Sequence, residues 1–507
     1  MSGSERHDRL LGWVARTHRL VATDRGRRSL SGLTSGLRSP LTVSMASMLE
    51  TGQRRWTPHA IAAYGEALGP GASMLTRAYV DTEIGSHSAG LLSAQRRADL
   101  LDAATESGRG VTATDLIEVV RWVTERTDPL GRSSWESLVR HCVDRACDLK
   151  GLVAESCDQA LLPLATHPIA GRIFYDYYEQ VASEVGHPKA FVPVIALQAD
   201  GAQVDLSRLV SELESPNNRW LIREHLNLAA AQVSHRTPEL KEGMRSRVQR
   251  AAFDWLIDGR SEHEVRRAAA RVLHESGSSQ TGAVKRVRLA DDVARIASGM
   301  PPGTAIKLVQ PDAVQVLDEL GQTCGADLPH DTILVELLSE CIFGLSDHER
   351  REATRWLRFS AYSSTLALQA RRRIGAARGS DYDSGRLRSW IRLLGKLGLD
   401  DEDSETLLDL AQQPLASVAT KETALWAVCD LAPIALACRT SENWQVVLDG
   451  LPQMSRATMQ RAIISALGRA GQWLTLTELQ RLLPEAEAER IWWLSRRAPS
   501  LWPTATV

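Results

Sequence analysis

The sequence predicts an all-α protein, and three of its features support this prediction. Apolar residues recur with the 3.6-residue period of a helix along most of the 507 residues, whereas the alternating pattern of a half-buried strand is scarce. Capping residues precede many of these segments, and short polar or Gly/Pro breaks separate them. With 43% hydrophobic and 24% charged residues, the chain has an ordinary soluble composition and is long enough to fold without disulfides or metal.

The same composition predicts a soluble, cytoplasmic protein without a membrane partner. The best apolar run, Leu425 to Cys438, is too short to span a bilayer and is broken by Asp430 and Pro433. No apolar segment typical of a secretory signal follows the charged N-terminal residues. The seven cysteines are an odd number, which favours reduced thiols over a disulfide framework.

Charge is distributed unevenly along the chain. Residues 1–80 contain 11 arginines and five acidic residues, a net charge of +6, so residues 81–507 carry −8 within a total of −2. A basic N-terminal segment therefore precedes an acidic body, and this asymmetry permits binding of nucleic acid by the N-terminal segment.

One segment, residues 41–69, has the pattern of two short helices joined by a tight turn. Thr42 is expected to cap the first helix, whose inward positions are Ala46 and Leu49. Gly52 is expected to end that helix, because a positive φ costs glycine little. The exposed side of this helix and the residues after it would then carry Val43, Ser44, Ser47, Met48, Gln53, Arg54 and Arg55.

The second helix of this segment is expected to begin at Thr57 and Pro58, a capping residue followed by proline at the first helical position. Gly69 and Pro70 are expected to end it. A short helix that exposes small polar side chains beside arginines fits the major groove of DNA.

The segment resembles the recognition-helix end of the Cro/repressor-type (XRE-like) helix-turn-helix. That family has the pattern Ser, any, apolar, Glu, any, Gly, any, Arg/Lys, then a small residue and Pro, and the matching residues here are Ser47, Met48, Leu49, Glu50, Thr51, Gly52, Gln53, Arg54, Arg55, Trp56, Thr57 and Pro58. The resemblance covers residues 7–69 and implies a first helix at about 7–21 and a second at about 29–38. The DNA-binding residues that it implies are Thr42, Val43, Ser44, Ser47, Met48, Thr51, Gln53, Arg54 and Arg55.

The sequence departs from the family pattern in three ways. The second helix contains Gly32 and Gly36, and the turn contains Pro40 where the family more often has glycine. The base-reading face has no Arg, Gln or Asn, the side chains that make bidentate contacts with bases. We therefore expect modest sequence discrimination, with phosphate contacts and the arginines at 25–28 supplying much of the affinity. The alternative is a small helical domain used for packing or dimerisation.

The body of the chain resembles degenerate HEAT-type helical repeats. Several expected helices share an Arg/Ala-rich inner face, and the short spacings between their starts suit helical hairpins of about 40 residues. These segments are 219–231, 263–273, 420–428 and 459–467. An irregular α-solenoid is thus expected, with an irregular helical bundle as the rival architecture. The expected domains are 1–80 (helix-turn-helix), 81–112 (linker), 113–275 and 286–507 (the two parts of the helical body).

The sequence shows no motif of a catalytic, cofactor or metal site. Residues 277–282 imitate the start of a phosphate-binding loop, but Ala283 and Val284 replace its Lys and Ser/Thr. Neither G-x-S-x-G nor H-E-x-x-H occurs. His225 is expected to be a hydrogen-bonded residue in the core or at its edge, and the acidic pair at 291 and 292 is expected on a solvated helix face. We expect no enzyme, no cofactor and no metal.

These observations predict a DNA-binding transcriptional regulator. Double-stranded DNA is the expected partner of the N-terminal domain, and the helical body is expected to provide oligomerisation or to bind a protein or effector. A homodimer is expected by analogy with other helix-turn-helix proteins. The alternative is an α-solenoid scaffold for protein–protein interactions that retains a vestigial helix-turn-helix.

Overall fold

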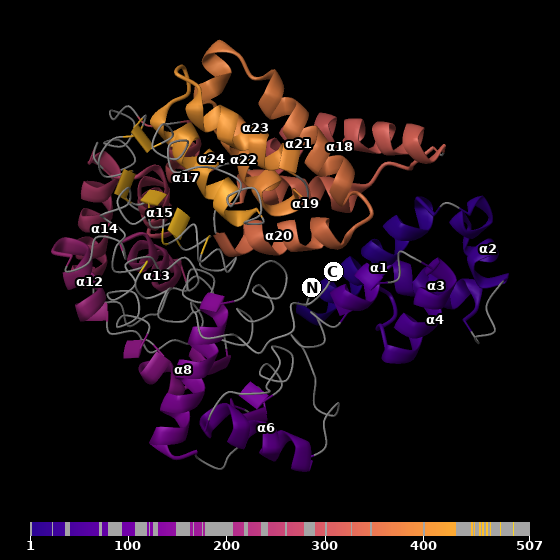
Figure 1. The fold of residues 1–507 in the computed structure, drawn as a ribbon, viewed down its shortest axis with the longest axis horizontal. Coiled ribbons are helices and arrows are strands. Elements are labelled where there is room, and N and C mark those ends of the chain that lie inside the picture. The colour runs from indigo at the N-terminus through magenta and orange to yellow at the C-terminus, as the bar shows by residue number, and fades with distance from the viewer. Residues whose placement is uncertain are drawn as a thin grey trace. The chain divides into compact units, whose positions relative to one another are not determined.

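The computed structural model in Figure 1 confirms the all-α prediction, since every regular element of the described residues is a helix. None of these helices combines the length and the apolar character that crossing a bilayer requires. The structure describes residues 3–22, 24–35, 41–69, 73–79, 94–106, 130–148, 206–216, 222–234, 242–258, 261–277, 291–299, 302–325, 327–344, 347–398 and 401–431, with shorter pieces within 119–124, 163–177 and 448–467 and single positions at 289, 477 and 490.

The chain forms two compact units, and both are discontinuous in sequence. The first unit comprises Met1–Leu92, Met300–Gly375 and Lys396–Leu399, and the second comprises Ser93–Gly299, Ala376–Gly395 and Asp400–Val507. The expected division was linear, whereas this grouping joins the N-terminal segment to residues more than 200 positions away. Within the expected linker, helix α6 (Ala94–Glu106) is described, and residues 81–93 and 107–112 lie outside the described residues.

The first unit is built from the N-terminal helices and a group of later ones. Its elements are α1 (Gly3–Leu20), η1 (Arg25–Arg28), α2 (Leu30–Ser35), α3 (Val43–Glu50), α4 (Pro58–Leu68), α18 (Pro302–Cys324), α19 (Thr332–Phe343), α20 (Asp347–Phe359) and α21 (Ser363–Ala376). Helix α1 packs on α3 and on α20. Helix α19 packs against α18, which precedes it in the sequence, and against α20, which follows it.

Local signals in the N-terminal sequence are confirmed. The Thr42 side chain accepts a hydrogen bond from the backbone N–H of Met45, and the Thr57 side chain accepts one from Ala60, both at 3.2 Å. Gly52 has φ +70°, as a helix stop of this kind requires. Helix α1 begins earlier than residue 7, and α2 is described over Leu30–Ser35. Residues 36–40, which hold Gly36 and Pro40, lie outside the described residues.

The second unit contains the remaining described helices. They are α6, α8 (Arg132–Asp148), α12 (Leu206–Glu214), α13 (Ile222–Ser234), α14 (Glu242–Ile257), α15 (His263–Glu275), α17 (Asp291–Ser298), η6 (Gly379–Asp383), α22 (Gly385–Leu397), α23 (Asp401–Gln412) and α24 (Val418–Asp430). Three of the four segments expected as repeats coincide with α13, α15 and α24, and the fourth is described only in part. The resemblance to HEAT repeats itself stays a prediction.

Helix α15 is the centre of the second unit, because it packs against α13, α14 and α17 and is buried on nearly every side. The prediction that residue 292 lies on a solvated face is wrong. Asp292 is 7% exposed, and it lies 2.7 Å from Nη2 of Arg388 and 3.0 Å from Nε2 of His263. Ion pairing explains the error, since a carboxylate with a charged partner can be buried where an unpaired one cannot.

Candidate nucleic-acid interface

All nine predicted DNA-binding residues lie on the molecular surface, along α3 and the loop that directly follows it. Seven side chains are exposed: Thr42, Val43, Ser44, Thr51, Gln53, Arg54 and Arg55. Ser47 and Met48 are half-buried beside them. The structure therefore brings the predicted set together on one short helix and one loop, a surface that we call the α3 face.

The opposite side of α3 is buried against α1. Ala46 and Leu49 are 0% and 1% exposed. Gly12 of α1 lies so close that a Cβ atom there would be 2.3 Å from the carbonyl oxygen of Leu49 and 2.6 Å from that of Glu50. Glycine at position 12 therefore lets the backbones of the two helices meet, and this contact fixes the distance of α3 from the N-terminal helix.

A buried polar network also holds α3 in place. Arg19 of α1 donates from Nε and Nη2 to the two carboxylate oxygens of Glu50, at 2.5 and 2.7 Å. Tyr64 of α4 donates its hydroxyl to the same carboxylate, and Arg19 also donates to the backbone carbonyl of Arg28. One carboxylate at the end of α3 thus joins the first, third and fourth helices of the segment.

The electrostatics of this network favour the charged form of Arg19. Burial alone would lower the pKa of Arg19, but the hydrogen bond and the negative charge of Glu50 outweigh it and raise that pKa. Burial, together with the charge of Glu50, raises the pKa of Tyr64 well above its usual value. Tyr64 therefore remains a neutral donor to the carboxylate of Glu50.

The loop after α3 is fixed by backbone hydrogen bonds. The N–H groups of Gln53 and Arg54 both donate to the carbonyl of Met48, at 2.9 and 3.1 Å. Trp56, which is 1% exposed, packs edge-on against Tyr64 with ring centroids 5.4 Å apart. The exposed residues 53–55 are therefore held on one side by the hydrogen-bonded end of α3 and on the other by the buried side chain of Trp56.

Much of the N-terminal positive charge is engaged within the first unit. On α1, Arg6 pairs with Glu340 at 2.7 Å, Arg9 with Glu336 at 2.9 Å, and Arg16 with Asp331 at 3.1 Å. The net charge of +6 is consequently a weaker indication of DNA binding than the sequence suggests, because these arginines face acidic side chains at and beside α19.

Two of the three arginines at 25–28, Arg27 and Arg28, are likewise involved in internal contacts. Arg27 pairs with Asp24 and donates to the carbonyl of Ala67 at 2.8 Å, and Arg28 donates to the carbonyl of Cys324 at 2.6 Å. These bonds tie η1 to α4 and to the end of α18. These internal contacts weaken the expectation that residues 25–28 supply DNA affinity.

Asp331 is the main anchor between α1 and α19. Its Oδ2 atom accepts hydrogen bonds from Trp13 Nε1 at 2.8 Å and from the hydroxyl of Tyr362 at 3.2 Å. Its Oδ1 atom caps α19 by accepting from the N–H groups of Ile333 and Leu334. Burial and the charge of Asp331 raise the pKa of Tyr362, so this hydroxyl also stays a donor.

Several residues that shape the α3 face were missed by sequence reasoning. Arg19 and Tyr64 carry no local signal, since their partner Glu50 is 31 and 14 positions away. Glu50 belongs to the helix-turn-helix pattern, and its place on the inner side of an amphipathic helix was the one available sign of a buried partner. Asp331 is 318 residues from Trp13, and no sequence pattern links them.

The described residues contain no group of three or more His, Cys, Asp or Glu side chains arranged to hold a metal ion. Comparison with known proteins gives no match to a family model, a curated protein or a solved structure. The resemblance to the XRE-like helix-turn-helix therefore depends on the sequence pattern from Ser47 to Pro58 alone.

Proposed function

We propose that this protein binds double-stranded DNA through the α3 face and regulates transcription. The observation that carries the proposal is an exposed eight-residue helix whose inner side is fixed by Gly12 and by the buried pair of Arg19 and Glu50. A helix that enters a groove must keep its orientation while its outer side chains lose water, and a buried network of this kind provides that rigidity.

The dimensions of α3 suit the major groove. An α-helix with its side chains is about 10–12 Å in diameter, and a major groove about 12 Å wide admits one. In this arrangement Val43 and Met48 contact thymine methyl groups or other apolar edges, and the hydroxyls of Ser44 and Ser47 hydrogen-bond to bases. Arg54 and Arg55 lie at the end of the helix, where they contact phosphates.

The test is DNA binding across a salt series, with two double variants that remove the same charge. Arg54→Ala/Arg55→Ala removes arginines of the α3 face, and the matched control Arg6→Ala/Arg9→Ala removes arginines that pair with Glu340 and Glu336. Fluorescence anisotropy with duplex DNA should show weaker binding for the first variant, and its slope of log K against log salt should fall by about 1.8.

The control variant should keep a slope close to that of the unmodified protein. An equal loss in both variants would mean that total charge and not the α3 face binds DNA. Absence of binding at low salt would refute the proposal. A selection from random duplexes that enriches no site would leave only non-specific binding, and regulation of particular genes would then be excluded.

A further inference from the structure

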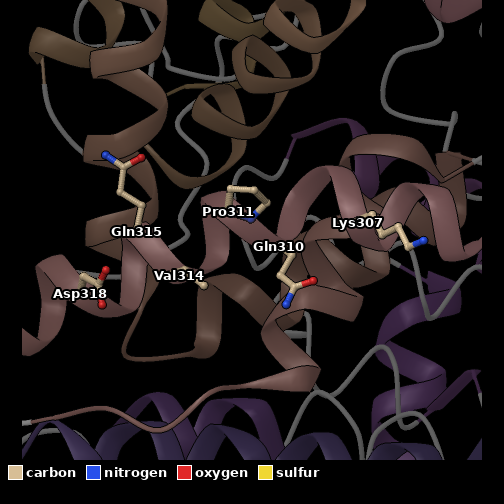
Figure 2. Close-up of a pocket in the computed structure, with 6 residues that line it drawn as sticks. All are labelled: Lys307, Gln310, Pro311, Val314, Gln315 and Asp318. Carbon is tan, nitrogen blue, oxygen red and sulfur yellow. The ribbon is translucent and has the colours of Figure 1, made fainter.

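Helix α18 presents a mixed polar and apolar face to solvent. Figure 2 shows six side chains along this helix that line a shallow hollow, and they are Lys307, Gln310, Pro311, Val314, Gln315 and Asp318. All six are exposed, and Val314 is 41% exposed. The inner side of the same helix is buried through Val309, Ala313 and Val316. We call the six residues the α18 face.

The order of residues on the α18 face is nearly symmetric about its midpoint. Counting outward from the point between Asp312 and Ala313, Pro311 matches Val314, Gln310 matches Gln315, and Lys307 matches Asp318. Figure 2 shows the same order in space, with Lys307 and Asp318 at the two ends and Pro311 and Val314 between them. Lys307 and Asp318 are 11 residues apart, about three helical turns, so they share one side of the helix.

We propose that the α18 face binds a second copy of this chain, with the two α18 helices antiparallel across a two-fold axis near the midpoint. A two-fold interface uses the same patch twice, so residue i meets residue j and j meets i. Each Lys307 then meets Asp318 of the other copy, which gives two opposite-charge pairs. Pro311 and Val314 form an apolar centre, and Gln310 meets Gln315.

The hydrogen-bonding groups at the centre fit this arrangement. Gln315 accepts from Arg373 at 3.0 Å and donates to Glu319 at 3.3 Å within its own chain. An amide has two donor hydrogens and two acceptor lone pairs, so Gln315 can still bond to Gln310 of the second copy. Pro311 has no N–H, which leaves the carbonyl of Lys307 without its usual helical donor and adds an acceptor to the face.

The size of the α18 face sets the expected affinity. A standard interface buries about 800 Å² on each partner, and one helix face provides less than this, so we expect a dimer of micromolar affinity. This inference is independent of DNA binding by the α3 face, because none of its residues contributes to that face.

Charge reversal tests the pairing directly in the full-length protein. Lys307→Asp places two acidic side chains opposite each other at both ends of the interface, and Asp318→Lys places two basic ones there. Sedimentation equilibrium should show a dimer Kd at least about tenfold weaker for each single variant. An equimolar mixture of the two single variants should recover a heterodimer, since every Asp then meets a Lys. The double variant Lys307→Asp/Asp318→Lys should recover the homodimer for the same reason.

The matched control is Asp327→Lys, an equal charge reversal at an exposed position of the same unit outside the α18 face. It should leave the dimer Kd unchanged, and far-UV circular dichroism should show equal helix content in all variants. A monomer at every concentration up to about 100 µM would overturn the inference, since that exceeds a micromolar Kd a hundredfold. A dimer that is insensitive to both reversals, or a mixture that fails to recover it, would overturn it as well.

Discussion

The buried pair of Arg19 and Glu50 should be strongly coupled in its effect on the stability of the N-terminal helices. Their side chains are 9% and 4% exposed, and two hydrogen bonds join them. Arg19→Met leaves a buried carboxylate with the Tyr64 hydroxyl as its remaining partner in this network, and Glu50→Leu leaves a buried guanidinium. Removing one member of a buried pair costs about 3–5 kcal/mol of folding free energy.

The double variant Arg19→Met/Glu50→Leu should cost far less than the sum of the two single variants. It leaves no uncompensated charge, and the main remaining cost is the Tyr64 hydroxyl without its acceptor, about 1–3 kcal/mol. The single variants should together cost about 6–10 kcal/mol, so the coupling free energy should be several kcal/mol. A pair on the surface provides the control: Arg9→Met/Glu336→Leu removes a pair whose side chains are 36% and 46% exposed. Such a pair contributes at most about 1 kcal/mol.

Hydrogen exchange measured by mass spectrometry is the suitable assay, because two units make a single unfolding transition unreliable and exchange reports on α1 and α3 separately. A loss of about 3 kcal/mol accelerates exchange of the protected amides by more than a hundredfold. Additive effects of the two single variants would refute the reasoning, as would a cost below about 1 kcal/mol for either one.

Two further predictions concern one glycine and one histidine. Gly12→Ala should separate α1 from α3 and accelerate exchange in both helices. At Gly243 of α14 an added Cβ meets no atom within 4 Å, so Gly243→Ala should leave exchange unchanged or slow it slightly. Equal behaviour of the two variants would contradict the packing described for Gly12. Burial lowers the pKa of His225 from 6.5 to about 4, so the stability of the second unit should be complete above pH 6.5 and should fall by roughly 2 kcal/mol by pH 5. His225→Leu should reduce that pH dependence in hydrogen exchange, and an unchanged pH profile would count against the burial of a neutral imidazole.

The parts of the fold that the sequence predicted are governed by local interactions. Thr42 and Thr57 cap helices through bonds to residues three positions away, and Gly52 ends a helix through its own backbone angle. The exposed positions of α3 follow from helical periodicity alone once the buried Ala46 and Leu49 are identified. Such short-range interactions depend on a few neighbouring residues, so the sequence predicts them without knowledge of the tertiary structure.

The unpredicted parts depend on partners that are distant in sequence. Arg388 pairs with Asp292 across 96 residues, and the polar character of Asp292 suggested solvent because its partner was unknown. The arginines of α1 presented the same problem, since a cluster of positive charge has the same sequence whether it faces DNA or Glu336 and Glu340. The net charge of a segment gives its excess of basic over acidic residues. Only the fold shows which of those charges are paired.

The discontinuity of the first unit has a consequence for the synthesis of the protein. Trp13 binds Asp331, so the N-terminal helix leaves the ribosome 318 residues before its anchor does. At about 5–20 residues per second, that interval lasts about 15–60 s. Throughout this time α1 exposes a tryptophan and three arginines whose acidic partners do not yet exist, while residues 93–299 of the other unit are made. Helix α1 is therefore made long before the residues that complete its unit, and a chain that stalls before residue 331 leaves Trp13 without its acceptor.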